Sequence, residues 1–288
     1  MVEQVDGPVE DGFAVLAVGF GLAEGPVVDQ GGDLWVSDAM RGGVHRVGPG
    51  EPATYVPGRR GVGGLVRHVS GALLAAGPDV AVVDERGAHA VLTEPSAAGF
   101  NDLGAGPAGE LLAGELHYRP FRGEPPVPGR VAIVDIDGRG RRFEGTVTWP
   151  NGIAVSATGW VYVADFAAGV VLRARWSEIG NPVLEPWWSS PSGQADGLAV
   201  DEEGCVVVAL GAGAGLARVR PDGTTDTIRA VPAGFVSSVC FAGDDRRDLV
   251  VTTGGDPTRR DAAGGRVLRV AVDVPGLPVP AVAVPLDG

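Results

Sequence analysis

Four side chains with oxygen donors stand at the beginnings of short apolar runs along this chain: Glu24, Asn101, Asn151 and Asp196. Two carboxylates and two amide carbonyls form a hard, oxygen-only donor set, which is the kind that binds Ca²⁺ in proteins. Calcium is therefore the first expectation, although Mg²⁺, Mn²⁺ or Zn²⁺ could occupy the same set. The alternative for any one of these residues is a turn, because Asn-Gly and Asp-Gly are common turn dipeptides.

The elements that would bring these residues together form a repeat. Six similar units each contain an opening motif, an apolar run, a polar or Gly-rich turn and a second apolar run, as in WPNGIAVSATGWVYVADF at 149–166. The residues that open the apolar runs are Glu24, Gly64, Asn101, Asn151, Asp196 and Ser238. A repeat of roughly 40–50 residues with several strands per unit is typical of a β-propeller.

The sequence thus predicts an all-β, six-bladed β-propeller. Residues 13–18 and 279–285, near the two ends of the chain, would pair in one blade and close the ring, which removes the open sheet edge. Since no linker divides the chain, we expect a tail over 1–12 and one propeller domain over 13–288. The innermost strand of each blade faces the central channel, so the opening residues would meet at one end of the axis.

Composition excludes several classes of function. The net charge of −13 repels nucleic acid and anionic lipid, so neither is expected as a partner. The chain contains no Lys, which excludes Schiff-base chemistry and a P-loop lysine. Cys205 and Cys240 give no disulfide framework and no zinc pattern. Without a secretory signal or a membrane-length apolar stretch, we expect a cytoplasmic protein; the oligomeric state cannot be read from the sequence.

Five of the stretches resemble the successive blade motifs of the senescence-marker-protein-30/gluconolactonase family. They are LAEGPVVDQGGDLWVSD, FNDLGAGPAGELLAGE, PNGIAVSATGWVYVADF, ADGLAVDEEGCVVVAL and SSVCFAGDDRRDLVVTT. The resemblance keeps the order of the motifs and extends over essentially the whole chain. It implies a six-bladed propeller with one divalent metal in the channel, and metal-dependent hydrolysis of a lactone or related ester, a small-molecule substrate.

The resemblance also implies roles for individual residues. Glu24, Asn151 and Asp196 would be the direct metal ligands. Asn101 would lie beside the metal, where it binds through water or touches the substrate, and Asp102 would line the pocket next to it. Asp196 would be the general base, with Asp102 as the second candidate.

Positions around this set depart from the family pattern. The family often has Arg two positions before the Asn of the Asn-Asp motif, where this chain has Gly99. It commonly has Trp two residues after the Pro of the Glu-Gly-Pro motif, where this chain has Val28. An intact metal set with altered surroundings favours a substrate that differs from a sugar lactone and is less polar.

Two further features could form walls for a substrate. The segment GELHYRPF at 114–121 could overhang the channel through Glu115, His117 and Tyr118, and Phe166 could be an apolar wall. The alternatives are a solvated connection for the segment and an ordinary position at the top of a blade for Phe166.

Two other functions stay open at this point. One is a biosynthetic enzyme of the same fold that carries out non-hydrolytic chemistry, such as cyclisation, isomerisation, elimination or epoxide opening. The other is a binding propeller with a structural metal and no turnover. The fold alone does not separate these functions from hydrolysis.

Overall fold

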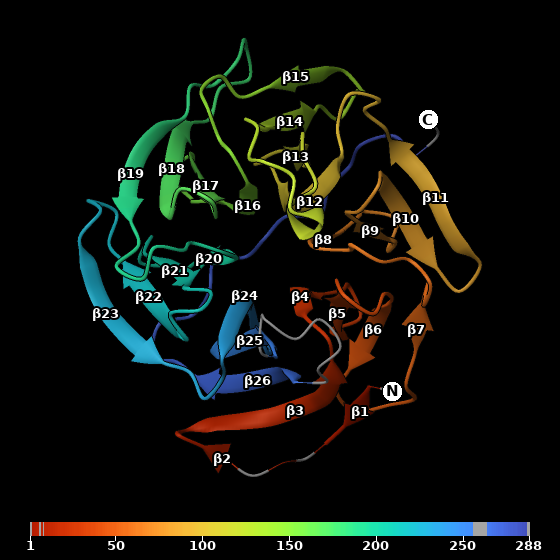
Figure 1. The fold of residues 1–288 in the computed structure, drawn as a ribbon, viewed down its shortest axis with the longest axis vertical. Helices are drawn as coiled ribbons and strands as arrows, with labels where there is room; N and C mark the ends of the chain where they lie inside the picture. The colour runs from red at the N-terminus through yellow and green to blue at the C-terminus, as the bar shows by residue number, and fades with distance from the viewer. Residues whose placement is uncertain (1, 6, 8, 256–263, 287–288) are drawn as a thin grey trace.

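Six antiparallel sheets surround a central axis in the computed structural model, which describes residues 2–5, 7, 9–255 and 264–286 (Figure 1). Five sheets have four strands, and the sixth has six. This arrangement confirms the predicted six-bladed β-propeller. Within the described ranges, the only helical element is the single 3₁₀ turn η1 (Pro120–Arg122), and no helix there is long and apolar enough to cross a membrane.

Blades 1 to 3 follow one another along the chain, each from its innermost strand outward. Blade 1 contains β4 (Ala23–Val28), β5 (Leu34–Asp38), β6 (Val44–Val47) and β7 (Thr54–Tyr55). Blade 2 contains β8 (Leu65–Arg67), β9 (Leu73–Ala75), β10 (Val80–Asp84) and β11 (Gly87–Leu92). Blade 3 contains β12 (Gly99–Ala105), β13 (Leu111–Leu116), β14 (Arg130–Val134) and β15 (Gly140–Arg142).

Blades 4 to 6 complete the ring. Blade 4 contains β16 (Pro150–Val155), β17 (Trp160–Asp165), β18 (Val170–Arg175) and β19 (Glu185–Ser189). Blade 5 contains β20 (Leu198–Val200), β21 (Val206–Ala209), β22 (Gly215–Val219) and β23 (Thr225–Ala230). Blade 6 contains β24 (Phe235–Ala242), β25 (Asp248–Gly254), β26 (Gly265–Ala271) and β3 (Phe13–Phe20), with two short strands added outside β3.

Apolar side chains pack between neighbouring blades. Leu112 and Ile133 of blade 3, for example, share a buried cluster with Ile153 and Val163 of blade 4. One such cluster lies at each of the six interfaces between consecutive blades. Because successive residues of a strand face opposite sides of its sheet, each blade contributes to the clusters on both sides. The ring is therefore held by face-to-face packing, and the innermost strands are left to border the channel (Figure 1).

The N-terminal strand closes the ring, with a partner other than the expected one. β3 pairs antiparallel with β26, where Ala17 lies opposite Val267. The short strands β1 (Glu3–Gln4) and β2 (Val9–Glu10), from the region expected to be a tail, pair with β3 in turn. The prediction that 279–285 would pair with 13–18 is wrong.

Residues 275–286, here called the C-terminal strap, instead cross the end of the channel. The strap bonds to blade 5, where the Leu277 N–H donates to the Val200 carbonyl at 2.9 Å. It reaches blade 3, where the Ala283 N–H donates to the Gly109 carbonyl at 2.7 Å. Figure 1 shows this segment in blue near the centre of the ring. Four prolines of the strap lack the N–H that a sheet ladder requires, which explains why β26 and not the strap pairs with β3.

Candidate metal centre and active site

The innermost strands that carry candidate ligands are irregular at their beginnings. In β16 the pairing with β17 shifts between Pro150 and Ile153, so that Asn151 and Gly152 form a bulge. Similar shifts occur at the beginnings of β4 and β12. A bulge breaks the strict alternation of side chains and aims a residue in a new direction. The irregularity therefore lets an otherwise regular blade present Asn151 to the end of the channel.

The glycines that follow the candidate ligands allow neighbouring blades to approach closely. A Cβ atom on Gly152 would lie 2.5 Å from the backbone nitrogen of Leu198, and one on Gly197 would lie 2.5 Å from the Cα of Ser238. Only a residue without a side chain fits against the next innermost strand at such distances. Since Asn151 and Gly152 lie within β16, the interpretation of this pair as a turn is wrong.

One pocket brings the candidate ligands together. Glu24, Asn101, Asn151 and Asp196 line the same cavity of about 280 Å³, which lies at the beginnings of the innermost strands. They come from blades 1, 3, 4 and 5. Phe166 lines this cavity as well. We call it the ligand pocket.

The carboxylates at this pocket are poorly compensated. Burial raises the pKa of Asp196 well above its ordinary value, and the charges of Glu24 and Asp102 raise it further. Burial and the charge of Asp102 likewise raise the pKa of Glu24 well above its ordinary value. Among the described residues that line the pocket, none is Arg or His. The negative charge therefore requires protons or a cation from solution.

The donor set fits a hard divalent cation. Asp196 is 2 % exposed, and its Oδ1 has no hydrogen-bond partner among the described residues. An unpaired buried carboxylate oxygen is costly, and a metal ion would satisfy it. No group of three or more His, Cys, Asp or Glu side chains in the described ranges is arranged to hold a metal, so the set depends on the amide oxygen of Asn151. The Asn101 amide nitrogen donates to the Pro150 carbonyl at 3.1 Å, which leaves its oxygen available to a cation or its water.

Asp165, which the sequence analysis did not single out, holds the loop before Asn151. Its carboxylate accepts hydrogen bonds from the backbone N–H groups of Thr148, at 2.7 Å, and Trp149, at 3.1 Å. The side chain is buried at the end of β17. Asp165 thereby determines how the chain enters β16 and presents Asn151.

Asp38 does the same for the loop before Glu24. It is buried at the end of β5 and accepts from the N–H groups of Gly21, at 2.9 Å, and Leu22, at 3.3 Å. The signal was present in the sequence, because Val-Ser-Asp in unit one and Val-Ala-Asp in unit four end their strands at equivalent positions. The role of these Asp residues could not be inferred from the sequence, because it depends on the path of the loop before the innermost strand.

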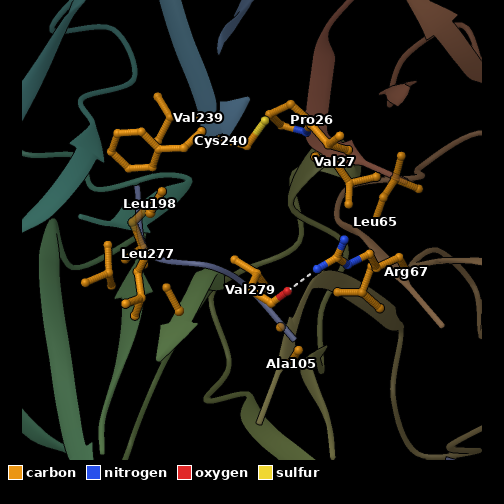
Figure 2. Close-up of a pocket in the computed structure, with 18 of the residues that line it drawn as sticks. Pro26, Val27, Leu65, Arg67, Ala105, Leu198, Val239, Cys240, Leu277 and Val279 are labelled. Carbon is orange, nitrogen blue, oxygen red and sulfur yellow. Dashed lines mark hydrogen bonds between the residues drawn. The ribbon is translucent and has the colours of Figure 1, made fainter. Parts of the chain in front are cut away.

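Asp102, the second candidate base, lines a separate cavity of about 380 Å³ along the rest of the innermost strands. Burial raises its pKa to about 7. The hydrogen bond that its carboxylate accepts from the Leu103 N–H, at 2.7 Å, acts in the opposite direction and lowers the pKa. Figure 2 shows this second cavity, which is mostly apolar and includes Cys240 and part of the C-terminal strap. The Arg67 guanidinium donates there to the Val279 carbonyl.

The residues predicted from the 114–121 segment lie outside both cavities. Glu115 is 5 % exposed, and its Oε2 lies 2.8 Å from Nε of Arg130, the residue opposite it in β14, and 3.3 Å from Nε2 of His117. This cross-strand ion pair keeps both side chains away from the ligand pocket. Tyr118 is buried edge-on against Trp149, with 6.2 Å between ring centroids. Of this segment, Pro120 lines the ligand pocket.

Most of the apolar side of the ligand pocket was not predicted from the sequence. Trp149 and Phe235 line it beside the expected Phe166. Trp149 directly precedes the Pro-Asn-Gly motif, so its position was visible, whereas Phe235 lies in another blade with no sequence signal for the contact.

Comparison with known proteins agrees with this architecture. A family model described as the SMP-30/gluconolactonase/LRE-like region matches residues 22–255. A 6-deoxy-6-sulfogluconolactonase from Pseudomonas putida is 28% identical over 265 residues, which cover 86% of this chain and 89% of the relative. The pentonolactonase XacC from Haloferax volcanii is 31% identical over 278 residues, which cover 89% of this chain and 93% of the relative.

Solved structures share the fold. A calcium-binding protein, regucalcin, from Agrobacterium tumefaciens superposes with a TM-score of 0.76 at 21% identity, covering 91% of this chain and 94% of that one. A gluconolactonase from Xanthomonas campestris gives a TM-score of 0.75 at 18% identity, with coverage of 90% and 89%. Together with the match over 22–255, the relatives show that the chain belongs to the SMP-30/gluconolactonase/LRE-like family.

Proposed function

We propose that this protein is a hydrolase of the lactonase class that depends on a divalent metal in the ligand pocket. The observation that carries the proposal is the buried, unpartnered Oδ1 of Asp196 in a pocket shared with Glu24 and Asn151. The two curated relatives described above are both named as lactonases, which supports the same reaction here. The substrate is a small molecule.

Glu24, Asn151 and Asp196 would hold the metal, with Asn101 beside them. Calcium is the first choice because the donors are all oxygens, and a structural neighbour is described as a calcium-binding protein. Mg²⁺, Mn²⁺ and Zn²⁺ are the alternatives. A bound divalent ion supplies Lewis-acid polarisation of a carbonyl and lowers the pKa of water.

The chain's own residues would handle the proton. Asp196 is the better candidate base, because it lines the ligand pocket, whereas Asp102 lines the second cavity. Asp196 accepts a proton from the attacking water as the water oxygen bonds to the carbonyl carbon. The ring C–O bond then breaks, and the proton passes to the leaving oxygen. The product is the open-chain hydroxy acid, and one water is consumed.

The test is turnover of γ-lactones, δ-lactones and aryl esters by metal-stripped protein, with calcium, magnesium, manganese or zinc added back. Hydrolysis that appears with metal and disappears in Asp196→Asn supports the proposal. The matched control is Asp137→Asn, whose carboxylate is 52% exposed in a surface turn. Hydrolysis that needs no metal, or that survives in Asp196→Asn, contradicts it. Metal binding without hydrolysis would favour the non-hydrolytic or binding alternatives.

A further inference from the structure

Three aromatic side chains form one side of the ligand pocket. They are Trp149, Phe166 and Phe235, here called the aromatic wall. The ring centroids of Trp149 and Phe166 lie 4.8 Å apart, and those of Phe166 and Phe235 lie 6.2 Å apart. All three side chains are only partly buried, although most large apolar side chains of this protein are covered. Contiguous apolar surface left open inside a pocket is typical of a binding site.

The aromatic wall is held in place from behind. The Phe166 N–H donates to the Trp149 carbonyl at 3.0 Å. The Asp165 carboxylate accepts from the Trp149 N–H at 3.1 Å. Tyr118, which is 4% exposed, packs edge-on against the Trp149 ring. These contacts hold the backbone at Trp149 and Phe166 and support the Trp149 ring, so a ligand loses little by ordering this part of the wall.

The polar side chains of the ligand pocket belong to few residues, here together called its polar base. Among the described lining residues, the side chains that form this group are those of the four candidate ligands and of Gln194. The Gln194 Oε1 already accepts from the Ala212 N–H at 2.6 Å. Apart from Trp149 and the weakly accepting thioether of Met40, the side chains of the remaining lining residues carry no hydrogen-bonding group.

This division implies a divided substrate. The carbonyl end of a ligand would lie at the polar base, and its substituent would lie against the aromatic wall. A substituent rich in hydroxyl groups would lose hydrogen bonds to water that the wall does not replace. An aryl or alkyl substituent has no such hydrogen bonds to lose, and it would bury apolar surface against aromatic faces.

We infer that the pocket takes lactones that carry an aryl or alkyl substituent in preference to polyhydroxylated sugar lactones. The inference rests on the proposed function, because it assumes that the ester carbonyl binds at the polar base.

Binding of unreactive ring analogues tests the preference without turnover. The probes are two γ-lactams, one with a phenyl group on the γ-carbon and one with hydroxyl groups in place of the phenyl group. Titration of calcium-loaded protein, followed by ligand-observed NMR, should give at least roughly tenfold tighter binding of the phenyl lactam. Phe166→Ser should remove most of that difference, and Phe166→Leu should remove less of it. The control Trp176→Phe changes an aromatic residue outside the pocket and should leave both affinities unchanged.

The inference is overturned if the hydroxylated lactam binds equally well or better, if neither lactam binds, or if Phe166→Ser leaves the preference intact. Hydrolysis of γ-phenyl-γ-butyrolactone and of a pentono-γ-lactone, measured in parallel, separates the two proposals. Faster hydrolysis of the pentono-γ-lactone overturns the inference and leaves the lactonase assignment standing. Binding of the phenyl lactam without hydrolysis of either lactone supports the ligand preference and contradicts the assignment.

Discussion

The two ends of the central channel are built from the same innermost strands and differ in chemistry. At the beginnings of the strands, bulges and close-packed glycines present carboxylates and amides to the ligand pocket. Further along, regular alternation resumes, and the second cavity is lined by Val, Leu and Pro side chains and crossed by the C-terminal strap (Figure 2). The proposed site therefore lies where the strands depart from regularity, and the apolar cavity lies where they do not.

The difference also appears in how charge is handled. At the ligand pocket, Asp196 Oδ1 is left without a partner. Elsewhere buried carboxylates are compensated: Asp201, also 2% exposed, lies 2.7 Å from Arg218. Because other buried carboxylates of the chain have a partner, the unpaired oxygen of Asp196 supports the proposal that a ligand binds there.

The largest expected effect is a loss of activity that distinguishes the ligand pocket from the second cavity. Asp196→Asn should lower kcat/KM for lactone hydrolysis by about a thousandfold or more, because it would remove both a proposed metal ligand and the proposed base. Asp102→Asn, which faces the second cavity, should cost much less. Steady-state kinetics at saturating calcium measure both variants. Equal losses would show that the two carboxylates belong to one site.

Asp165→Ala should lower both stability and activity. It leaves the N–H groups of Thr148, Trp149 and Ala168 without their acceptor, which should cost about 3 kcal/mol of unfolding free energy. Because Asn151 follows this loop, calcium affinity should fall as well. Urea unfolding and calcium titration measure the two effects. Asp84→Ala, at a turn of blade 2 and away from the channel, is the control that should leave calcium affinity unchanged.

Substitution behind the second cavity should affect stability alone. Val282 of the C-terminal strap is 0% exposed in the cluster between blades 2 and 3. Val282→Ala should cost about 2 kcal/mol of unfolding free energy through the cavity it leaves. The value of kcat/KM for the lactone should stay as in the unmodified protein. A loss of activity in Val282→Ala that is still fully folded would show that the two ends of the channel are coupled.

Raising the pH should destabilise the metal-free protein. The pKa of Asp102 is about 7 in the folded state against an ordinary 3.8, and those of Glu24 and Asp196 are shifted the same way. The folded state therefore binds these protons more tightly than the unfolded state. The resulting stabilisation is present below about pH 4 and is lost as the pH rises through 7 and above.

The melting temperature of metal-free protein should accordingly fall between about pH 5 and pH 8. Saturating calcium should reduce the fall, because it binds the charged carboxylates, and Asp102→Asn should flatten part of it. If the melting temperature rose over this range, and did so with the same slope in the unmodified protein and in Asp102→Asn, the raised pKa of Asp102 would be contradicted.

The smallest effect concerns a thiol of the second cavity. Burial raises the pKa of Cys240 to about 12, so its thiolate fraction near pH 8 is only about one in ten thousand. Iodoacetamide should modify native Cys240 slowly, and Cys240→Ala should leave lactone hydrolysis unchanged. Mass spectrometry after timed labelling measures the rate. Rapid modification of the folded protein would show that the strap does not cover this end.

Much of this architecture was predictable from the sequence, because each blade repeats its own local pattern. The order of the opening motifs was sufficient to expect Glu24, Asn101, Asn151 and Asp196 at one end of the axis. The strand that closes the ring was harder to predict, because the C-terminal strap and β26 are both apolar and only the prolines of the strap distinguish them.

The parts that could not be predicted depend on contacts across blades. Glu115 looked available to a substrate until the register of β13 and β14 placed Arg130 opposite it. Phe235 joins Phe166 only because blades 4 and 6 both reach the top of the same channel. Local patterns record which face of a strand a residue occupies, but not which distant residue meets it there.

The central claim is that Glu24, Asn151 and Asp196 hold a divalent metal at one end of the channel. Calorimetric titration of metal-stripped protein with calcium tests it most directly, with Glu24→Gln and Asp196→Asn alongside Asp137→Asn. We expect one bound ion per chain in the unmodified protein and in Asp137→Asn, and none in Glu24→Gln or Asp196→Asn. Absence of binding to the unmodified protein by calcium and by the other three ions, or undiminished binding in Asp196→Asn, would contradict it.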